Sequence, residues 1–408
     1  MKKIILILIT FTHLVNNTNA QWQTTNGPSA TATVITMAVN STNLFANVYD
    51  GVHSYANAAW SFPANTGFPI GSDINALFVS GTNLFATFQL DGGVSVSPDS
   101  GASWLPAYNG LPTMLGGQLY AVHALNSSGN TNPIFAGTEK GVYSTMNNGN
   151  SWTPAGLLTS DVRCLANHGT EVFAGTYNSG VYYSNNNGTS WTATNNGLTD
   201  TTILSLLYAG VDTLFAGTIH GVFRTIDNGA NWTNISTGLP TIFAAEVGAL
   251  VKYDNTIIAG SRNGGVFTNT MNGNSWTANN VGFTSGGVYS LAIKGTNVYA
   301  GIGQGGVWTR ALSELTAVNE LSVENNQVTI FPNPVTDVCT ISINNSSTLN
   351  YLITSSPLKL YDVTGRAVLQ QTFSADDKID LSILSKGVYI IELNDKEGRI
   401  LNGKIVKQ

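Results

Sequence analysis

Short apolar runs separated by polar, glycine-rich gaps recur along the chain from residue 34 to residue 311. One unit repeats: an apolar run, a polar gap, a segment close to Leu-Phe-Ala-Gly-Thr, a variable pair, Gly-Val-Tyr, and a polar turn that ends in Trp. Runs of this kind, bounded by turn residues, predict short β-strands. The glycine before the valine recurs every 39 to 48 residues, at Gly51, Gly93, Gly141, Gly180, Gly221, Gly265 and Gly306.

Seven copies at this period predict an all-β, seven-bladed β-propeller with one four-stranded sheet per blade. The first strands are expected at 34–39, 74–79, 119–125, 162–166, 203–208, 247–252 and 288–293. The second strands are expected at 44–48, 84–88, 134–138, 172–176, 214–218, 257–261 and 298–302. Each third strand starts at a Gly-Val, and the fourth begins at Trp60, Trp104, Trp152, Trp191, Trp232 and Trp276.

The seventh copy has no fourth strand after Gly306, and the missing piece is found near the other end of the chain. Residues 21–27, Gln-Trp-Gln-Thr-Thr-Asn-Gly, match residues 190–197 of an internal copy. An open ring would leave two unpaired sheet edges, and closure removes both. The sequence therefore predicts that the N-terminal strand completes the last blade.

The chain divides into four segments by pattern and composition. Residues 1–20 are typical of a signal peptide, with Lys2 and Lys3 before an apolar run and small residues before Gln21. The propeller is expected at 21–312, a glutamate-containing linker at 313–326, and a small antiparallel β-sandwich at 327–408. No later run approaches the ~18 apolar residues of a membrane helix. The protein is expected to be exported.

Charge and composition narrow the chemistry. The formal net charge is −6, and no basic stripe of the kind that binds nucleic acid is present. Cys164 and Cys339 fall in different predicted domains and form no disulfide framework. His53, His123, His168 and His220 show no metal-ligand spacing, and the glycines form no phosphate-binding loop. We expect no cofactor and no metal.

The polar turn before each Trp carries a second pattern. Two copies contain Ser or Thr, Asp, Gly and Trp at fixed spacing, and the residues predicted to be structural are Asp99, Gly101, Trp104, Asp227, Gly229 and Trp232. An Asp side chain accepts backbone N–H bonds within such a turn, the glycine supplies a positive φ, and the Trp packs between blades. We interpret these residues as structural rather than catalytic.

These turns resemble the Asp-box of BNR-type repeats, which occurs in sialidases and sortilin-like propellers. Over about residues 21–312 the repeats also resemble those of photosystem-assembly-factor-like proteins. The resemblance implies a propeller architecture and places the Asp-box turns away from the ligand-binding face. It does not imply a particular activity, since propellers carry many unrelated ones.

The C-terminal segment contains three spaced blocks: Pro-Asn-Pro at 332–334, Tyr-Asp-Val-Thr-Gly-Arg at 361–366, and Gly-Val-Tyr at 387–389. In this order they resemble the C-terminal sorting domain of the type IX secretion system of Bacteroidetes. The resemblance implies that the partner of this domain is the type IX secretion machinery. It also implies removal of the domain and release or anchoring at the outer membrane. A carbohydrate-binding or adhesion module is the alternative.

The loops between the second and third strands differ from copy to copy, unlike the strands themselves. In a propeller they share a rim with the loops that join blades, and variable loops on a repeated fold are expected at a binding face. Neutral drift at exposed positions would give the same variation. The candidate binding residues are Asp50, Asp91, Glu139, Tyr177, His220 and Arg262.

We interpret the protein as a non-enzymatic propeller that binds a protein or glycan at the cell surface. The alternative is a secreted glycoside hydrolase that uses rim carboxylates such as Asp50 and Asp91, because glycoside hydrolysis usually needs two carboxylates ~5–9.5 Å apart. A sialidase is disfavoured, because it needs an arginine cluster and the Arg-Ile-Pro motif of that family is absent. The propeller arginines are scattered, at Arg163, Arg224, Arg262 and Arg310.

Overall fold

The computed structural model describes residues 21–408, except 30, 49, 63, 70–72, 90–92, 115–121, 128–132, 241–244, 284–285, 317–327, 332, 344–355, 363–365, 374–377 and 395–399. The chain divides into two compact units, Met1–Ala317 and Val318–Gln408. The predicted signal peptide lies outside the described residues.

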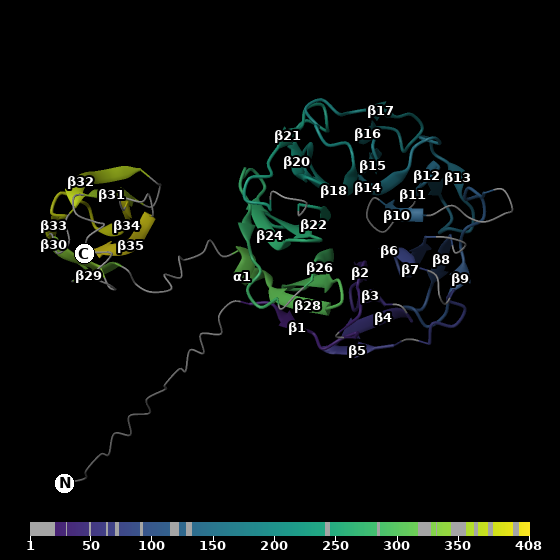
Figure 1. The fold of residues 1–408 in the computed structure, drawn as a ribbon, viewed down its shortest axis with the longest axis horizontal. Helices are drawn as coiled ribbons and strands as arrows, with labels where there is room; N and C mark the ends of the chain where they lie inside the picture. The colour runs from purple at the N-terminus through teal and green to yellow at the C-terminus, as the bar shows by residue number, and fades with distance from the viewer. Residues whose placement is uncertain are drawn as a thin grey trace, which may run out of the picture. The chain divides into compact units, whose positions relative to one another are not determined.

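The first unit is a ring of seven four-stranded antiparallel sheets (Figure 1). Blade one contains β2 (Met37–Val39), β3 (Leu44–Val48), β4 (Gly51–Ala56) and β5 (Ala59–Ser61). Blade two contains β6 (Ile74–Ser80), β7 (Asn83–Phe88), β8 (Val94–Ser97) and β9 (Leu105–Pro106). Blade three contains β10 (Val122–Ser127), β11 (Ile134–Thr138), β12 (Gly141–Thr145) and β13 (Thr153–Pro154). Blade four contains β14 (Val162–His168), β15 (Glu171–Thr176), β16 (Val181–Ser184) and β17 (Thr192–Ala193).

The remaining blades continue the same order around the ring. Blade five contains β18 (Ile203–Gly210), β19 (Thr213–Thr218), β20 (Gly221–Thr225) and β21 (Thr233–Asn234). Blade six contains β22 (Val247–Tyr253), β23 (Thr256–Ser261), β24 (Gly265–Thr270) and β25 (Thr277–Ala278). Blade seven contains β26 (Val288–Lys294), β27 (Asn297–Ile302), β28 (Gly306–Ala311) and β1 (Gln23–Thr24). The predicted seven-bladed all-β fold is confirmed.

The second strand of each blade carries the core, because each sheet is covered on both faces by its neighbours. All five residues of β3 are buried, and so are all five of β11. This is why these segments read as continuous rather than alternating apolar runs. Strand β2 begins three residues later than predicted, at Met37. The Asn47 side-chain oxygen accepts the N–H groups of Ile35 and Thr36 there, at 3.0 and 2.9 Å, in place of a strand ladder.

A tryptophan ties each blade to the blade before it. Its indole Nε1 donates to a group just after the last strand of that preceding blade, for example from Trp152 to the Ala107 carbonyl at 2.7 Å. The other donors are Trp60, Trp104, Trp191, Trp232, Trp276 and Trp22. An indole N–H that is buried needs an acceptor, so each bond fixes one blade against the next.

The turns before Trp104 and Trp232 are held by their own side chains. Asp99 Oδ1 accepts the Ser103 N–H at 2.8 Å, and Gly101 N–H, at φ +94°, donates to Ser97 Oγ at 2.7 Å. Hydrogen bonds from Ser103 lower the pKa of Asp99 below its usual value. Asp227 accepts the Asn231 N–H at 2.8 Å in the same arrangement.

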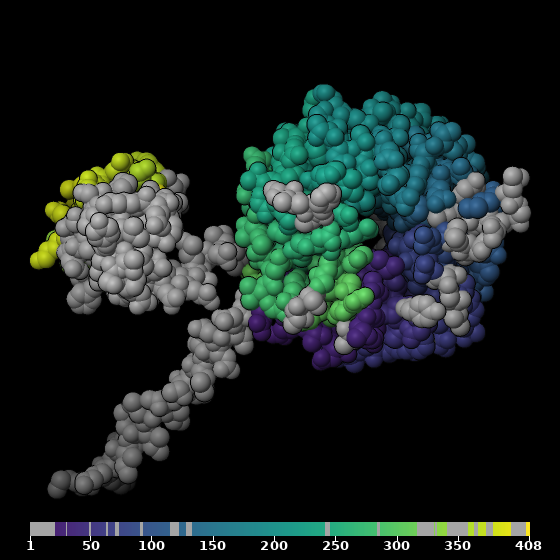
Figure 2. All heavy atoms as spheres, viewed as in Figure 1, coloured from purple at the N-terminus to yellow at the C-terminus, as the bar shows by residue number. Residues whose placement is uncertain are grey.

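The ring closes at the N-terminal strand, as the sequence predicts. In β1, Gln23 pairs with Thr309 and Thr24 pairs with Trp308 of β28. Trp22 is 1% exposed, stacks on Phe283 with ring centroids 4.7 Å apart, and donates its indole N–H to the Asn279 carbonyl at 2.6 Å. Figure 2 shows the N-terminal residues (purple) against the last blade (green).

The start of the expected linker 313–326 is instead structured. Helix α1 (Leu312–Thr316) follows β28 directly, and Leu312 and Leu315 are buried in the same core cluster as Trp22. Arg310 Nε donates to Glu314 Oε2 at 3.2 Å, so this glutamate anchors the helix to the propeller. A glutamate between leucines is compatible with a solvated linker and with a short buried helix, so the sequence pattern alone does not separate the two.

The second unit contains two antiparallel sheets around one core. One sheet contains β29 (Val328–Phe331), β30 (Val338–Ile343) and β33 (Lys378–Asp380). The other contains β31 (Ser356–Asp362), β32 (Ala367–Phe373), β34 (Gly387–Asn394) and β35 (Ile400–Lys407). Cys339 and Ile379 of the first sheet share a buried cluster with Leu358, Leu360 and Ile391 of the second.

Replacing Trp22 tests how much the contact between blades six and seven contributes to the stability of the propeller. Trp22→Ala is expected to lower the free energy of unfolding of the propeller by about 3–5 kcal/mol, because a fully buried Trp side chain and its hydrogen bond are lost. Urea unfolding followed by tryptophan fluorescence measures the change. The control Leu105→Ala, at a side chain that is 58% exposed, should stay within about 0.5 kcal/mol of wild type. Equal stability of the two variants would contradict closure of the ring by the N-terminal strand.

A candidate binding site at the channel mouth

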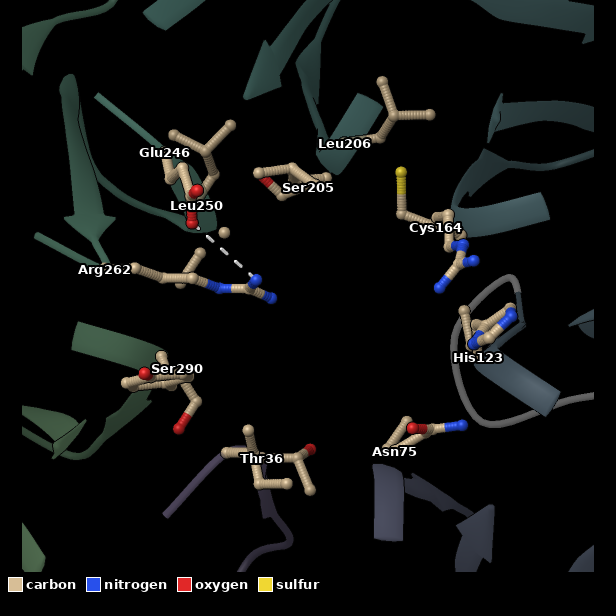
Figure 3. Close-up of a pocket in the computed structure, with 18 of the residues that line it drawn as sticks. Thr36, Asn75, His123, Cys164, Ser205, Leu206, Glu246, Leu250, Arg262 and Ser290 are labelled. Carbon is tan, nitrogen blue, oxygen red and sulfur yellow. Dashed lines mark ion pairs between the residues drawn. The ribbon is translucent and has the colours of Figure 1, made fainter. Parts of the chain in front are cut away.

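The inner strands of the seven blades surround a cavity of about 580 Å³ in the propeller channel (Figure 3). Residues from every blade line it, because the first strand of each sheet is the innermost one. A cavity of this size is in the range of small-ligand sites. Seven different blades can therefore each place a side chain against one ligand.

A β-bulge near the start of six of the inner strands places one residue outside the strand ladder. In β14, for example, the register shifts between Val162 and Cys164, so Arg163 has no partner in β15. Such bulges redirect a side chain. The residue at this position differs in every blade and always lines the cavity: Ile35, Asn75, His123, Arg163, Leu204, Gly248 and Tyr289.

We call the end of the channel at which the inner strands begin the mouth. One cluster of polar side chains at the mouth consists of His123, Asp161, Arg163 and Tyr177. Arg163 Nη2 donates to Asp161 Oδ2 at 2.5 Å, and its guanidinium carbon lies 5.1 Å from the centre of the Tyr177 ring. His123 Nε2 lies 3.3 Å from Asp161 Oδ1. Burial acts to raise the pKa of Asp161, but the contacts with His123 and Arg163 outweigh it, so the pKa lies below its usual value. Asp161 is therefore ionised at neutral pH.

The second set consists of Glu246, Arg262 and Tyr289. Arg262 Nη1 lies 3.9 Å from Glu246 Oε2, and its guanidinium carbon lies 5.5 Å from the centre of the Tyr289 ring. Figure 3 shows the Arg262 side chain reaching toward the middle of the cavity, with His123 and Asn75 on other blades facing it. The mouth therefore carries two arginines, each beside one carboxylate and over one tyrosine.

The same backbone connection places both carboxylates. Asp161 and Glu246 each stand directly before the first strand of a blade. The backbone carbonyl of each accepts the N–H of the first residue in the loop that joins the second and third strands of the same blade. Tyr177 N donates to Asp161 O at 2.9 Å, and Arg262 N donates to Glu246 O at 3.0 Å. The two kinds of loop thus meet at one rim, which is the arrangement that the sequence analysis assumed.

The small hydroxyl groups lining the channel make contacts between blades. Thr36 Oγ1 accepts the Leu77 N–H at 2.9 Å, and Ser205 Oγ donates to the Val247 carbonyl at 2.9 Å. Ser290 Oγ donates to the Val34 carbonyl at 3.4 Å and links blade seven to blade one. These hydroxyls thus hold neighbouring inner strands together.

The candidate residues from the sequence lie in two groups. Tyr177 and Arg262 line the cavity. Asp50, Glu139 and His220 are outside the set that lines it; Asp50 pairs with His53 at 3.1 Å, and His220 pairs with Asp200 at 2.9 Å. Asp91 lies outside the described residues. The binding role of all six stays a prediction.

Several residues that line the cavity are not among the candidates from the sequence, namely Asn75, His123, Arg163, Glu246 and Tyr289. Apart from Glu246, they stand at the second position of a first strand, where the residue varies from copy to copy as it does in the loops. Among the described residues, no cluster of three or more His, Cys, Asp and Glu side chains has the arrangement of a metal site. No helix in the described part of the chain is long and apolar enough to span a membrane.

Residues 329–408 match the family described as the secretion system C-terminal sorting domain. This match confirms the expectation from the three sequence blocks, and it indicates export through the type IX system to the cell surface or beyond. Its partner is accordingly the type IX secretion machinery.

Two solved structures resemble the chain in fold. PorZ of Porphyromonas gingivalis, described as an essential surface component of the type-IX secretion system, is 15% identical with a TM-score of 0.51, over 91% of this chain and 59% of PorZ. YCF48 bound to D1 peptide is 15% identical with a TM-score of 0.55, over 71% of this chain and 94% of YCF48. At these identities the likeness shows the β-propeller fold alone.

One curated relative matches over a shorter stretch. An endo-acting ulvan lyase of Formosa agariphila is 30% identical over 105 residues, which are 24% of this chain and 18% of the lyase. The chain thus spans less than a fifth of that relative.

The ionised Asp161 should leave a signature in the pH dependence of stability. Asp161→Asn is expected to lower the free energy of unfolding at neutral pH by about 1–3 kcal/mol, because Arg163 loses a charged partner. Since the folded-state pKa of Asp161 lies below the ordinary 3.8, its contribution is present above that value and is lost as pH falls through the folded pKa.

Urea unfolding of wild type and variant at neutral pH and in acid checks this. The two curves should converge in acid, and Asp50→Asn, at an exposed carboxylate, should differ little from wild type at any pH. A difference that persists unchanged below the folded pKa would show that Asp161 does not act through its charge.

Proposed function

We propose that the propeller is a non-enzymatic binding module that holds a protein or glycan at its channel mouth after export to the cell surface. One observation carries this proposal: the residues at the bulge position of the inner strands, which differ from blade to blade, gather around a single cavity, while the sheets that support them repeat. Variable side chains converging on one concavity of a rigid ring are what a ligand-specific site requires.

The polar groups at the mouth favour binding over neutral drift. Arg163 Nε is buried and has no hydrogen-bond partner among the described residues, whereas His123 Nε2 lies 3.3 Å from Asp161 Oδ1. Burying a donor without a partner costs stability, so drift alone would tend to remove it. The Arg163 side chain as a whole is 35% exposed, so its guanidinium is open to a ligand. This supports a site that is completed by its ligand.

The similar proteins support the proposal at the level of fold. YCF48 is described as bound to a peptide, and PorZ is described as a bacterial surface component. The Asp-box resemblance is a further part of the proposal, supported by carboxylates such as Asp99 and Asp227 that bond within their own turns. The match to the ulvan lyase covers too little of that enzyme to carry its activity here.

Export is proposed in two steps. The segment 1–20 would direct passage to the periplasm and be cleaved before Gln21, which would free Trp22 and β1 to close the ring. The C-terminal domain would then take the protein across the outer membrane, with release or anchoring at the surface.

A glycoside hydrolase that uses rim carboxylates is the alternative. Such an enzyme usually needs one carboxyl group that stays protonated as the acid. Asp161 has a lowered pKa and is paired with Arg163, and Glu246 is beside Arg262. His123 and Arg163 favour the ionised form of Asp161, so this carboxyl group is poorly suited to be the acid, which supports binding over hydrolysis.

A glycan array and a set of candidate surface proteins, run beside a panel of glycoside substrates, separate the two functions. We expect saturable binding without turnover, weakened about tenfold or more by Tyr177→Ala, because that ring forms part of the mouth. The matched control Tyr253→Ala changes a tyrosine at the far end of the inner strand β22 and should bind as wild type does. Turnover that is abolished by Asp50→Ala or Asp91→Ala would overturn the proposal in favour of the hydrolase.

A further inference from the structure

Two arginines reach the same cavity from different blades and from different positions in the repeat. Arg163 is the bulge residue of β14 in blade four, and Arg262 follows the second strand β23 in blade six. Both line the cavity, and each lies over a tyrosine ring, Tyr177 or Tyr289. Each arginine thus lies beside a carboxylate and over a tyrosine. The sequence repeat does not explain this likeness, because the two arginines occupy different positions within the repeat. A shared ligand would explain it.

The guanidinium groups have donors available for such a ligand. Arg163 uses Nη2 for Asp161, and its side chain is 35% exposed, so part of its guanidinium is open to the cavity. Arg262 is 3.9 Å from Glu246, which is longer than a hydrogen bond. An arginine carries five N–H donors in a planar fork that matches the oxygens of a carboxylate or sulfate.

The two carboxylates balance the charge of the two arginines. Asp161 lies beside Arg163 and Glu246 beside Arg262, so the charges of these four side chains cancel. An oxyanion entering between the arginines would take up donors that the carboxylates leave unused. The expected selectivity is therefore for a ligand that presents oxyanion oxygens to both guanidinium groups rather than for polyanions in general.

The shape of the cavity favours a saccharide over a peptide. The inner strands surround it on all sides, so it is a round cavity of about 580 Å³ rather than a groove. Peptides usually bind along a groove or an open strand edge over several residues. A round cavity takes the end of a chain more readily, and tyrosine rings beside polar donors suit a sugar ring with its hydroxyl groups. Tyr177, 51% exposed, offers such a surface.

We infer that the channel mouth binds an acidic saccharide whose carboxylate or sulfate group is held between Arg163 and Arg262, with Tyr177 and Tyr289 against the sugar. The inference rests on the proposed binding function and specifies its ligand class. Carboxylate and sulfate share this chemistry, so the experiment must distinguish them.

Isothermal titration calorimetry of the exported protein tests the inference with four ligands. They are trigalacturonate, a sulfated galactose trisaccharide, the neutral galactose trisaccharide, and a hexaglutamate peptide. At least one acidic saccharide should bind about tenfold or more tightly than the neutral one, and the better of the two identifies the oxyanion. Arg262→Gln and Arg163→Gln should each weaken that binding about tenfold or more, because each removes a charged hydrogen bond to the oxyanion.

The control Lys294→Gln removes the same charge at the far end of the inner strand β26 and should leave affinity within about twofold. Thermal unfolding of each variant shows whether it is folded. Equal binding of the neutral saccharide, tighter binding of the peptide, or no effect of the arginine variants would overturn the inference. The binding function would survive any of these results if Tyr177→Ala still weakened the bound ligand. It would fail as well if no glycan or protein bound.

Discussion

The indole N–H bond from each blade to the one before it is the contact on which the ring depends. Seven tryptophans make it, and the residue that accepts the bond always follows the last strand of the preceding blade. Each bond fixes the outer edge of one sheet relative to the next, so the wedge angle between blades is set seven times. Closure needs all seven, and Trp22, which precedes the strand that completes blade seven, supplies the last one.

Because the blades are fixed to one another at their outer edges, the residues at the mouth of the channel can differ from blade to blade. Hydroxyls such as Ser205 hold the inner strands to their neighbours, and the bulge residues are then released from pairing. Arg163 and Tyr289 can therefore differ from the corresponding residues of other blades without disturbing any ladder. The outer part of each blade therefore repeats while the residues at the mouth vary, and the proposed binding site uses the variable residues.

The repeated blade could be predicted from the sequence because each of its features is determined by residues close together in the chain. Glycine at positive φ before each third strand, the turn around Asp99, and the continuous apolar second strands are each set by neighbouring residues. The site was harder to predict. His123, Asp161 and Arg163 come from two adjacent blades, and their contacts depend on a bulge that no local pattern marks. Helix α1 is not marked by a local pattern for a similar reason, since the core that buries Leu315 is built partly by Trp22, at the opposite end of the propeller sequence.

Whether the N-terminal strand closes blade seven is the central claim, and a cross-link tests it most directly. Gln23 and Thr309 are partners across β1 and β28, at a Cα spacing of about 5.5 Å that a disulfide can bridge. Mild oxidation of the Gln23→Cys, Thr309→Cys double variant should form one intramolecular disulfide, found by mass spectrometry as a peptide joining the two positions. The account predicts near-complete cross-linking in the folded protein. Cross-linking only between molecules, or none at all, would contradict it.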